Sequence, residues 1–215
     1  MISFLGNLRQ NKVMAQPRKV TAQPRQLVLA STSKYRKELL ARLCLAFEVA
    51  APGVHEAVLA GEAPADTALR LSVLKSRALE KEFPDALIIG SDQVAAMGSE
   101  RFEKPGNYDN ARRQLRSLSG KACDFLTAVT LFDARSRQSE SRMVACRVHF
   151  RTLDERRIEA YLRREQPYDC SASAKAEGLG IALIARMETD DPTSLIGLPL
   201  IALSEMLERA GLPVV

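Results

Sequence analysis

The first residues that can do chemistry lie where a short apolar run turns polar, at residues 26–31 (QLVLAS). The run predicts a buried strand, and Ser33 can cap the helix that follows it. A turn from strand to helix presents backbone N–H groups to anions. Here Ser31 and Arg36 add a hydroxyl and a guanidinium for phosphate oxygens. The same residues also fit a plain helix cap beside exposed basic side chains, so this segment alone leaves both interpretations open.

A carboxylate, Asp92, follows the most strand-like run of the chain, residues 86–91 (ALIIGS). We expect this strand to end there, which places Asp92 at its C-terminal end, where ligands bind in α/β sheets. Such a carboxylate can bind Mg²⁺ beside substrate phosphates or accept a proton from water. A strand-ending Asp can equally cap a turn, and Lys75 and Lys104 alone are ordinary surface and loop lysines.

Several functional classes are excluded by what the chain lacks. The glycine motifs of phosphate loops, dinucleotide-binding turns and hydrolase elbows are absent. The four cysteines form no CxxC pair and the chain has only two histidines, so we expect reduced, mostly buried thiols and no structural zinc. No apolar run approaches the ~18 to 20 residues that a membrane helix needs. These features predict a cytoplasmic protein without a membrane partner.

The net charge of +5 is concentrated at the N-terminus. Residues 1–25 hold five of the 31 basic residues and no acidic one, so 26 basic residues balance 26 acidic ones in the remainder. A neutral remainder argues against a nucleic-acid partner. Residues 1–25 lack an apolar period and are predicted to be a disordered basic extension, with residues 26–215 forming one domain. A targeting segment, or a true start at Met14, stays open as an alternative.

The elements that must position these residues alternate between strand and helix. Strands are expected at residues 26–31, 47–50, 86–91, 124–133, 141–151 and 181–187. Helices are expected after Ser33 and at residues 64–83, 109–118, 154–164 and 200–210. The polar residues 134–139 between two long strands indicate a hairpin. This order predicts an α/β or α+β protein with a mixed sheet.

The order and spacing of several short segments carry more information than any one of them. The segments are LASTS (29–33) with Arg36, IIGSDQ (88–93), KP (104–105), SGK (119–121), KAEG (175–178) and GLP (197–199). Together they resemble the motifs of the Maf family, and the resemblance covers the chain from about residue 26 to its end. It implies a mixed twisted sheet in two lobes around a central cleft, similar to inosine triphosphate pyrophosphatases.

The implied activity is that of a metal-dependent nucleoside triphosphate pyrophosphatase. The resemblance assigns triphosphate binding to Ser31, Arg36, Lys75, Lys104 and Lys175. It assigns a divalent metal, Mg²⁺ or Mn²⁺ with Co²⁺ as an alternative, to Glu56 and Asp92, and makes Asp92 the catalytic proton acceptor. These residue types fit the chemistry. Attack of water on the α-phosphorus needs a base, cations on the leaving pyrophosphate and a metal bridging the oxygens.

Three positions, Tyr35, Gln93 and Glu177, distinguish branches of the family and set substrate specificity. An aromatic residue, Gln and Glu resemble the branch that acts on 7-methyl-GTP, whereas Arg, Thr and Gln are typical of the dTTP and UTP branch. A 7-methylated guanine is cationic, so an aromatic face would stabilise it by roughly 0.5 to 2 kcal/mol. Glu177 can accept hydrogen bonds from the guanine N–H groups and offset the positive charge.

The chain departs from this branch near both ends of the expected site. Tyr35 stands where Trp is usual, and Lys34 stands where Pro is usual. Gly53 and His55 replace part of an acidic cluster beside Glu56. We expect weaker metal binding from this loss of carboxylates, in preference to a site in which His55 is a ligand.

These observations predict a hydrolase that converts 7-methyl-GTP to 7-methyl-GMP and pyrophosphate and so limits the incorporation of modified nucleotides. Its expected partner is a small nucleotide. Cleavage of dTTP and UTP is one alternative, and a non-catalytic nucleotide-binding regulator of cell division is another. Monomer and homodimer are both left open.

Overall fold

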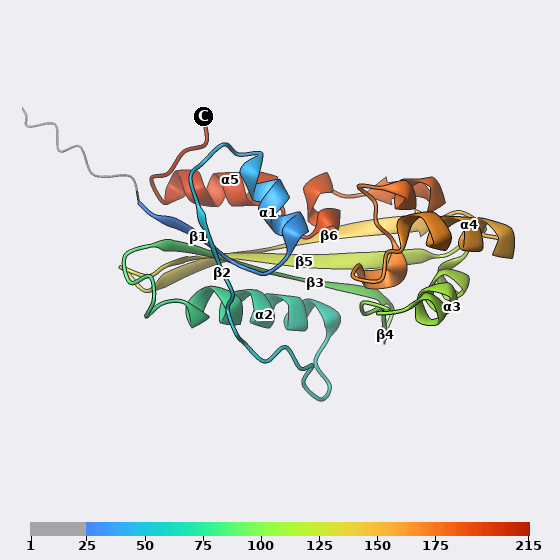
Figure 1. Ribbon diagram of the computed structural model, residues 1–215. Helices are drawn as coiled ribbons and strands as arrows, with labels where there is room; N and C mark the ends of the chain where they lie inside the picture. The colour runs from blue at the N-terminus through green and yellow to red at the C-terminus, as the bar shows by residue number, and fades with distance from the viewer. Residues whose placement is uncertain (1–24) are drawn as a thin grey trace, which may run out of the picture.

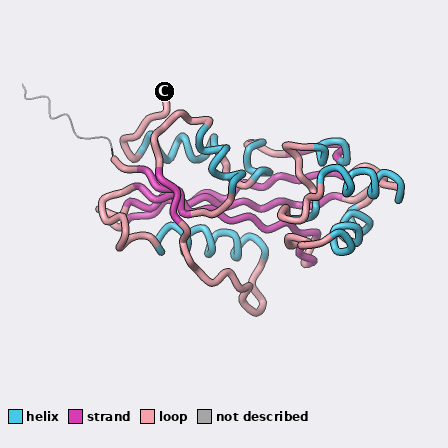
Figure 2. The backbone as a smooth tube through the Cα atoms, viewed as in Figure 1, coloured by secondary structure: helices cyan, strands magenta, loops and turns pink. Residues whose placement is uncertain are grey.

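The structure is a computed structural model that describes residues 25–215 (Figure 1; Figure 2). One seven-stranded sheet has the order β2-β1-β3-β5-β6-β7, with β4 paired to β3 outside this path. The strands are β1 (Leu27–Ala30), β2 (Glu48–Ala50), β3 (Leu87–Met97), β4 (Glu100–Arg101), β5 (Ala122–Asp133), β6 (Gln138–Phe150) and β7 (Ile184–Glu188). The α-helices are α1 (Lys34–Ala41), α2 (Pro64–Ala78), α3 (Tyr108–Leu118), α4 (Glu155–Glu165) and α5 (Leu200–Arg209). Three short 3₁₀ helices are η1 (Ser171–Ser173), η2 (Leu179–Leu183) and η3 (Pro192–Ile196).

The sheet is mixed, as the order of elements predicts. β1 pairs in parallel with β2 and β3, whereas β3 with β5, β5 with β6 and β6 with β7 are antiparallel. The four residues of β1 are all buried, as expected for a strand covered on both faces. The predicted hairpin is the β5–β6 pair, whose turn begins after Asp133.

Two groups of helices lie at opposite ends of the long strands β3, β5 and β6 (Figure 1). α1 and α5 cover one face of the sheet beside β1, α2 covers the other face, and α3 and α4 lie at the far end. Each end has its own core. Leu29, Leu39 and Leu203 belong to a buried cluster at the β1 end. Leu115 and Phe125 belong to another cluster at the far end. The two-lobed mixed α/β arrangement is therefore confirmed.

The prediction that the third strand ends at Ser91 is wrong. β3 continues to Met97, so Asp92 lies inside the strand and not at its C-terminal end. The reason is tertiary, because β5 pairs with β3 along its length from Leu87 to Ala96. Only the parallel neighbour β1 stops early, at its pairing with Gly90. Asp92 is thus two residues beyond the end of the parallel pair.

Smaller differences concern where elements begin and end. α2 ends at Ala78, several residues before the predicted limit at Pro84. β7 begins at Ile184, because the residues before it form η2. β4 is too short to be recognised from its sequence.

The predicted N-terminal extension lies, apart from Arg25, outside the described residues. The Arg25 guanidinium donates to the Asp133 carboxylate at 3.1 Å and to the backbone oxygen of Asp85, so this residue is attached to the domain. Within residues 25–215 no helix is long and apolar enough to cross a membrane. All four cysteines are free.

Candidate active site

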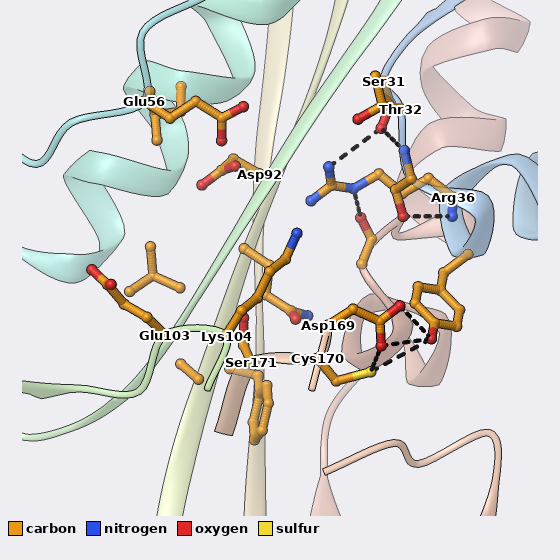
Figure 3. A pocket seen from close by; sticks show the side chains of 18 of the residues that line it. Ser31, Thr32, Arg36, Glu56, Asp92, Glu103, Lys104, Asp169, Cys170 and Ser171 are labelled. Carbon is orange, nitrogen blue, oxygen red and sulfur yellow. Dashed lines mark hydrogen bonds between the residues drawn. The ribbon is translucent and has the colours of Figure 1, made fainter. Parts of the chain in front are cut away.

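A cavity of about 750 Å³ lies between the two lobes, at the edge of β3 (Figure 3). Its walls come from the β1–α1 turn, the loop after β2, α2, β3, the loop after β4, the loop after α4, and η3. The cavity exists because one edge of β3 is left without a neighbour. β3 pairs with β1 as far as Gly90 and with β4 from Ala96, and no strand of the described chain pairs with this edge between them. A ligand can therefore reach the middle of the sheet.

Asp92 points from this part of β3 towards α2, where it forms an ion pair with Lys75. The Lys75 ammonium lies 2.6 Å from the Asp92 carboxylate and 2.8 Å from Glu56 Oε2, which belongs to the loop after β2. Lys75 and Asp92 are only 4% and 7% exposed, whereas the Glu56 side chain is 54% exposed. A buried charge of either sign is costly without its partner. The Lys75 ammonium and the Asp92 carboxylate therefore stay in contact, which holds both side chains in one orientation.

The close approach of α2 to β3 depends on Gly90. A Cβ atom at this position would lie 2.1 Å from the Ser72 backbone oxygen and 2.7 Å from the Ser76 backbone nitrogen. Because side chains alternate along a strand, Gly90 and Asp92 face the same helix. The missing side chain of Gly90 therefore lets α2 lie close enough for Lys75 to reach Asp92.

The alternate residues of β3, Ser91 and Gln93, face the opposite wall. Ser91 Oγ donates to the Gly197 backbone oxygen at 2.9 Å. The amide nitrogen of Gln93 donates to the Ser194 and Leu195 backbone oxygens at 2.8 and 3.1 Å. Gln93 is predicted to set specificity, and in the structure its amide N–H groups hold η3. No hydrogen bond within residues 25–215 involves its carbonyl oxygen, which is free to accept from a ligand.

The β1–α1 turn brings Ser31 and Arg36 to the cavity. Ser33 caps α1 as predicted, with its hydroxyl accepting from the Arg36 backbone N–H at 3.4 Å. The Arg36 guanidinium donates to the Gly197 backbone oxygen at 2.9 Å and lies 3.5 Å from Ser31 Oγ. Burial lowers the pKa of Arg36, while the negative charges of Asp92 and Glu56 oppose the shift. The group is a fixed cation on the wall opposite Lys75.

Lys104 is an exposed cation of the cavity. Its side chain comes from the loop after β4 and extends into the space between Asp92 and Arg36 (Figure 3). It is exposed, and no hydrogen bond or ion pair within residues 25–215 involves its ammonium. An anionic ligand can therefore bind Lys104 without breaking an existing contact.

The far end of the cavity is formed by Tyr35, Asp169, Cys170 and Glu177. The Tyr35 hydroxyl donates to the Asp169 carboxylate at 3.1 Å, and the Cys170 thiol lies 3.7 Å from the same hydroxyl. Burial raises the pKa of Cys170 to about 11 and also raises that of Tyr35, so both groups are protonated at neutral pH. Desolvation raises the pKa of Glu177 as well. This end offers an aromatic ring and two carboxyl groups.

Comparison with known proteins shows which family the chain belongs to. A family model described as Maf-like protein matches residues 26–210. The chain is 56% identical over 188 residues to a 7-methyl-GTP pyrophosphatase of Thiobacillus denitrificans, covering 87% of this chain and 94% of that one. It is 54% identical over 187 residues to a 7-methyl-GTP pyrophosphatase of Cupriavidus pinatubonensis, with coverages of 87% and 94%. The chain belongs to the Maf family.

A solved structure, that of the Staphylococcus aureus Ham1 protein, aligns with 59% of this Maf chain and 72% of its own. The identity is 13% and the TM-score is 0.42, which is too low to support an argument about the site.

Nine of the ten residues that the Maf motifs single out line this cavity. They are Ser31, Tyr35, Arg36, Glu56, Lys75, Asp92, Gln93, Lys104 and Glu177. Lys175, predicted to bind the triphosphate, is not brought to it. Its ammonium pairs with Glu165 of α4 at 2.7 Å, although its neighbours Ala174 and Glu177 do line the cavity.

The sequence did not indicate Asp169, Cys170, Arg101 or Glu103, which also line the cavity. Asp169 and Cys170 follow α4 in a segment without periodicity, and Arg101 and Glu103 belong to or follow the two-residue strand β4. No local pattern marks such positions, because only the packing of the two lobes brings them to the same space.

The carboxylates of this Maf protein fit a divalent cation held jointly with phosphates. Glu56 and Asp92 both approach the single nitrogen of Lys75, so their oxygens converge from the loop after β2 and from β3. Within the described residues no cluster of three or more His, Cys, Asp or Glu side chains is arranged to hold a metal ion. Mg²⁺ is commonly bound by one or two carboxylates together with substrate phosphates, which matches this donor set.

Proposed function

We propose that this Maf protein hydrolyses 7-methyl-GTP to 7-methyl-GMP and pyrophosphate. The observation that carries the proposal is the polarity of the cavity. Lys75, Arg36 and Lys104 surround Asp92 at one end, whereas Tyr35 and carboxyl groups form the other. A nucleotide with an anionic triphosphate and a cationic base is complementary to both ends. The relatives named above carry the same activity in their names.

At the phosphate end, Asp92 accepts the proton of the water that attacks the α-phosphorus. The contact of 2.6 Å with Lys75 holds the carboxylate in one orientation, which is the requirement for an efficient general base. Arg36 and Lys104 bind the phosphates from the opposite side, with Ser31 adding a hydroxyl. These cations stabilise the charge that develops on the leaving pyrophosphate. Mg²⁺ or Mn²⁺, held by Glu56 and Asp92 together with phosphate oxygens, would neutralise phosphate charge.

At the base end, the ring of Tyr35 stacks on the purine. The positive charge that methylation adds to the imidazole part of guanine is attracted to the ring face. Glu177 accepts from the guanine N–H groups, and the Gln93 carbonyl oxygen provides a further acceptor. A uracil or thymine base has no positive charge and fewer donors, so it leaves these acceptors unpaired.

A cytoplasmic location is part of the proposal, because the substrate is a free nucleotide. Four free cysteines are consistent with a reducing compartment. Removing the methylated nucleotide from the pool would limit its incorporation into RNA. Whether the enzyme works as a monomer or as a homodimer is measured by sizing the active protein in solution.

The deciding experiment measures pyrophosphate release from 7-methyl-GTP, GTP, UTP and dTTP with Mg²⁺, Mn²⁺ and Co²⁺, for proteins that start at Met1 and at Met14. We expect 7-methyl-GTP to give the highest kcat/KM with at least one of these metals. Equal or higher values with UTP or dTTP would refute the guanine assignment. Absence of turnover with every metal, with nucleotide still bound, would indicate a regulatory binding protein.

The role of Asp92 is tested in the same assay with Asp92→Asn. Loss of a general base lowers kcat by about 10²- to 10⁴-fold, and binding of 7-methyl-GMP should persist. Asp85→Asn is the control, since that carboxylate is 73% exposed and pairs with Arg135 outside the cavity. Unchanged turnover in Asp92→Asn would exclude Asp92 as the base.

A further inference from the structure

The base end of the cavity already holds a positive charge, which is supplied by the protein itself. The Lys34 ammonium lies 4.8 Å from the centroid of the Tyr35 ring and 3.2 Å from the Asp169 carboxylate. All three residues line the cavity. A cation on an aromatic face with a carboxylate beside it is the environment that a methylated purine requires. Neither Lys34 nor Asp169 is indicated as a site residue by the Maf motifs.

Asp169 is suited to hold a cation because it is ionised and oriented. Burial acts against its ionisation, but the hydrogen bonds from Lys34 and Tyr35 outweigh burial and hold the pKa of this carboxyl below its ordinary value. Its two oxygens accept from the Tyr35 hydroxyl at 3.2 and 3.1 Å, which fixes the carboxylate at the edge of the ring (Figure 3). The pKa of Glu177, by contrast, is raised by desolvation. Asp169 is therefore the more firmly charged of the two carboxyl groups.

Lys34 is held loosely enough to leave. Its side chain is 64% exposed and that of Asp169 is 53% exposed, so water can solvate the ammonium as soon as the contact opens. Ion pairs this exposed contribute little to stability. Asp169 is also the only carboxylate with which Lys34 forms an ion pair within residues 25–215. Release of Lys34 exposes an ionised carboxylate and an open ring face.

We propose that Lys34, Tyr35 and Asp169 form a cation subsite in which Asp169 is a specificity-determining residue for a positively charged base. Lys34 occupies the subsite in the free protein, and the cationic purine displaces it. The inference rests on the proposed function, because it assigns recognition of the methylated base. It adds two residues to that site, one that attracts the charge and one that competes with it.

The subsite is tested by binding without turnover, using calorimetry with 7-methyl-GMP and GMP at a pH at which the methylated base is cationic. The wild-type protein should bind 7-methyl-GMP more tightly than GMP. Asp169→Asn keeps the shape and removes the charge, so it should weaken 7-methyl-GMP binding about tenfold and leave GMP binding nearly unchanged. A variant that loses affinity for both ligands equally would show a structural role and overturn the assignment.

Lys34→Gln gives the opposite expectation. Removing the competing ammonium should tighten 7-methyl-GMP binding by about two- to fivefold, which is the range for breaking an exposed ion pair, with no gain for GMP. Lys37→Gln is the matched control, since Lys37 is exposed on the same helix and does not line the cavity. Weaker binding of 7-methyl-GMP to Lys34→Gln would refute competition by Lys34.

The two proposals fail in different ways. If the wild-type protein binds 7-methyl-GMP and GMP equally, the cation subsite is wrong whatever the turnover. If it prefers 7-methyl-GMP through Asp169 but cleaves UTP or dTTP faster than 7-methyl-GTP, the subsite stands and the proposed function fails. Tyr35→Phe separates ring from hydroxyl. The Tyr35→Phe protein should still bind 7-methyl-GMP more tightly than GMP, because the aromatic face remains.

Discussion

Replacing Gly90 by alanine tests whether the packing of α2 on β3 is what builds the catalytic pair. The added Cβ would lie 2.1 Å from the Ser72 backbone oxygen, whereas ordinary contacts begin at 3.4 Å. The Ser72 oxygen belongs to the backbone and the added Cβ is bonded directly to it, so neither atom can move aside by a side-chain rotation. Helix α2 must therefore move away from β3 by about 1.3 Å, the difference between these two distances. Overpacking of this kind costs about 1 to 3 kcal/mol of folding free energy.

The same movement carries Lys75 away from Asp92. Their contact of 2.6 Å would lengthen beyond hydrogen-bonding distance, and a misplacement of about 1 Å can lower the rate about 100-fold. We therefore expect Gly90→Ala to lose both stability, measured by urea unfolding, and kcat/KM, measured by pyrophosphate release. The loss of kcat/KM should persist at temperatures at which the variant is fully folded.

Gly211→Ala serves as the control for this experiment. Gly211 has a φ of +79° after α5, and a Cβ atom added there would meet no atom within 4 Å, so alanine costs about 1 to 2 kcal/mol of backbone strain alone. Its kcat/KM should match the wild type. If Gly90→Ala were destabilised but fully active, the position of α2 would not control Lys75 and the reasoning would be refuted.

Two further predictions concern Lys104 in the cavity and Glu62, which precedes α2 and accepts from the Arg70 guanidinium and the Thr67 hydroxyl. Lys104→Ala should raise KM for the nucleotide by about tenfold or more, because it removes a charge-assisted contact to phosphate. The melting temperature should stay unchanged, because Lys104 is exposed, and a fall in stability with KM unaltered would contradict its role. Glu62→Gln should flatten the acid side of the stability–pH curve. Hydrogen bonds from Arg70 lower the pKa of Glu62 to about 2 from an ordinary 4.5, so its contribution is complete above pH 4.5 and is lost as the pH falls towards 2. Urea midpoints between these pH values measure the effect, and parallel curves for the variant and the wild type would refute it.

Much of the local structure was predictable because it depends on residues close together in the chain. The apolar run before Ser31, the cap at Ser33 and the helix predicted at residues 109–118 all appear within a residue of where the pattern places them. The alternation of strand and helix also predicts a mixed sheet, and the motif order predicts the family. The identity of most cavity residues follows from these motifs.

The length of β3 was not predictable in the same way. The local pattern weakens after Ser91, and the strand continues to Met97 because β5 supplies hydrogen-bonding partners as far as Ala96. Strand formation depends on a neighbour that is distant in sequence. A prediction from residues 86–91 alone therefore stops too early.

The sequence by itself determined which elements form and which side chains are available for chemistry. Only the tertiary structure decided which of them meet. It pairs Lys175 with Glu165 outside the cavity, and it brings Asp169 to Tyr35 across 134 positions of the chain. The physical reason is the range of the forces involved. Helix capping and hydrophobic periodicity involve residues within one or two turns of each other, so they can be read from the sequence. An ion pair or hydrogen bond between the lobes depends on how β3, β5 and β6 join the two separately packed cores, which no local pattern records.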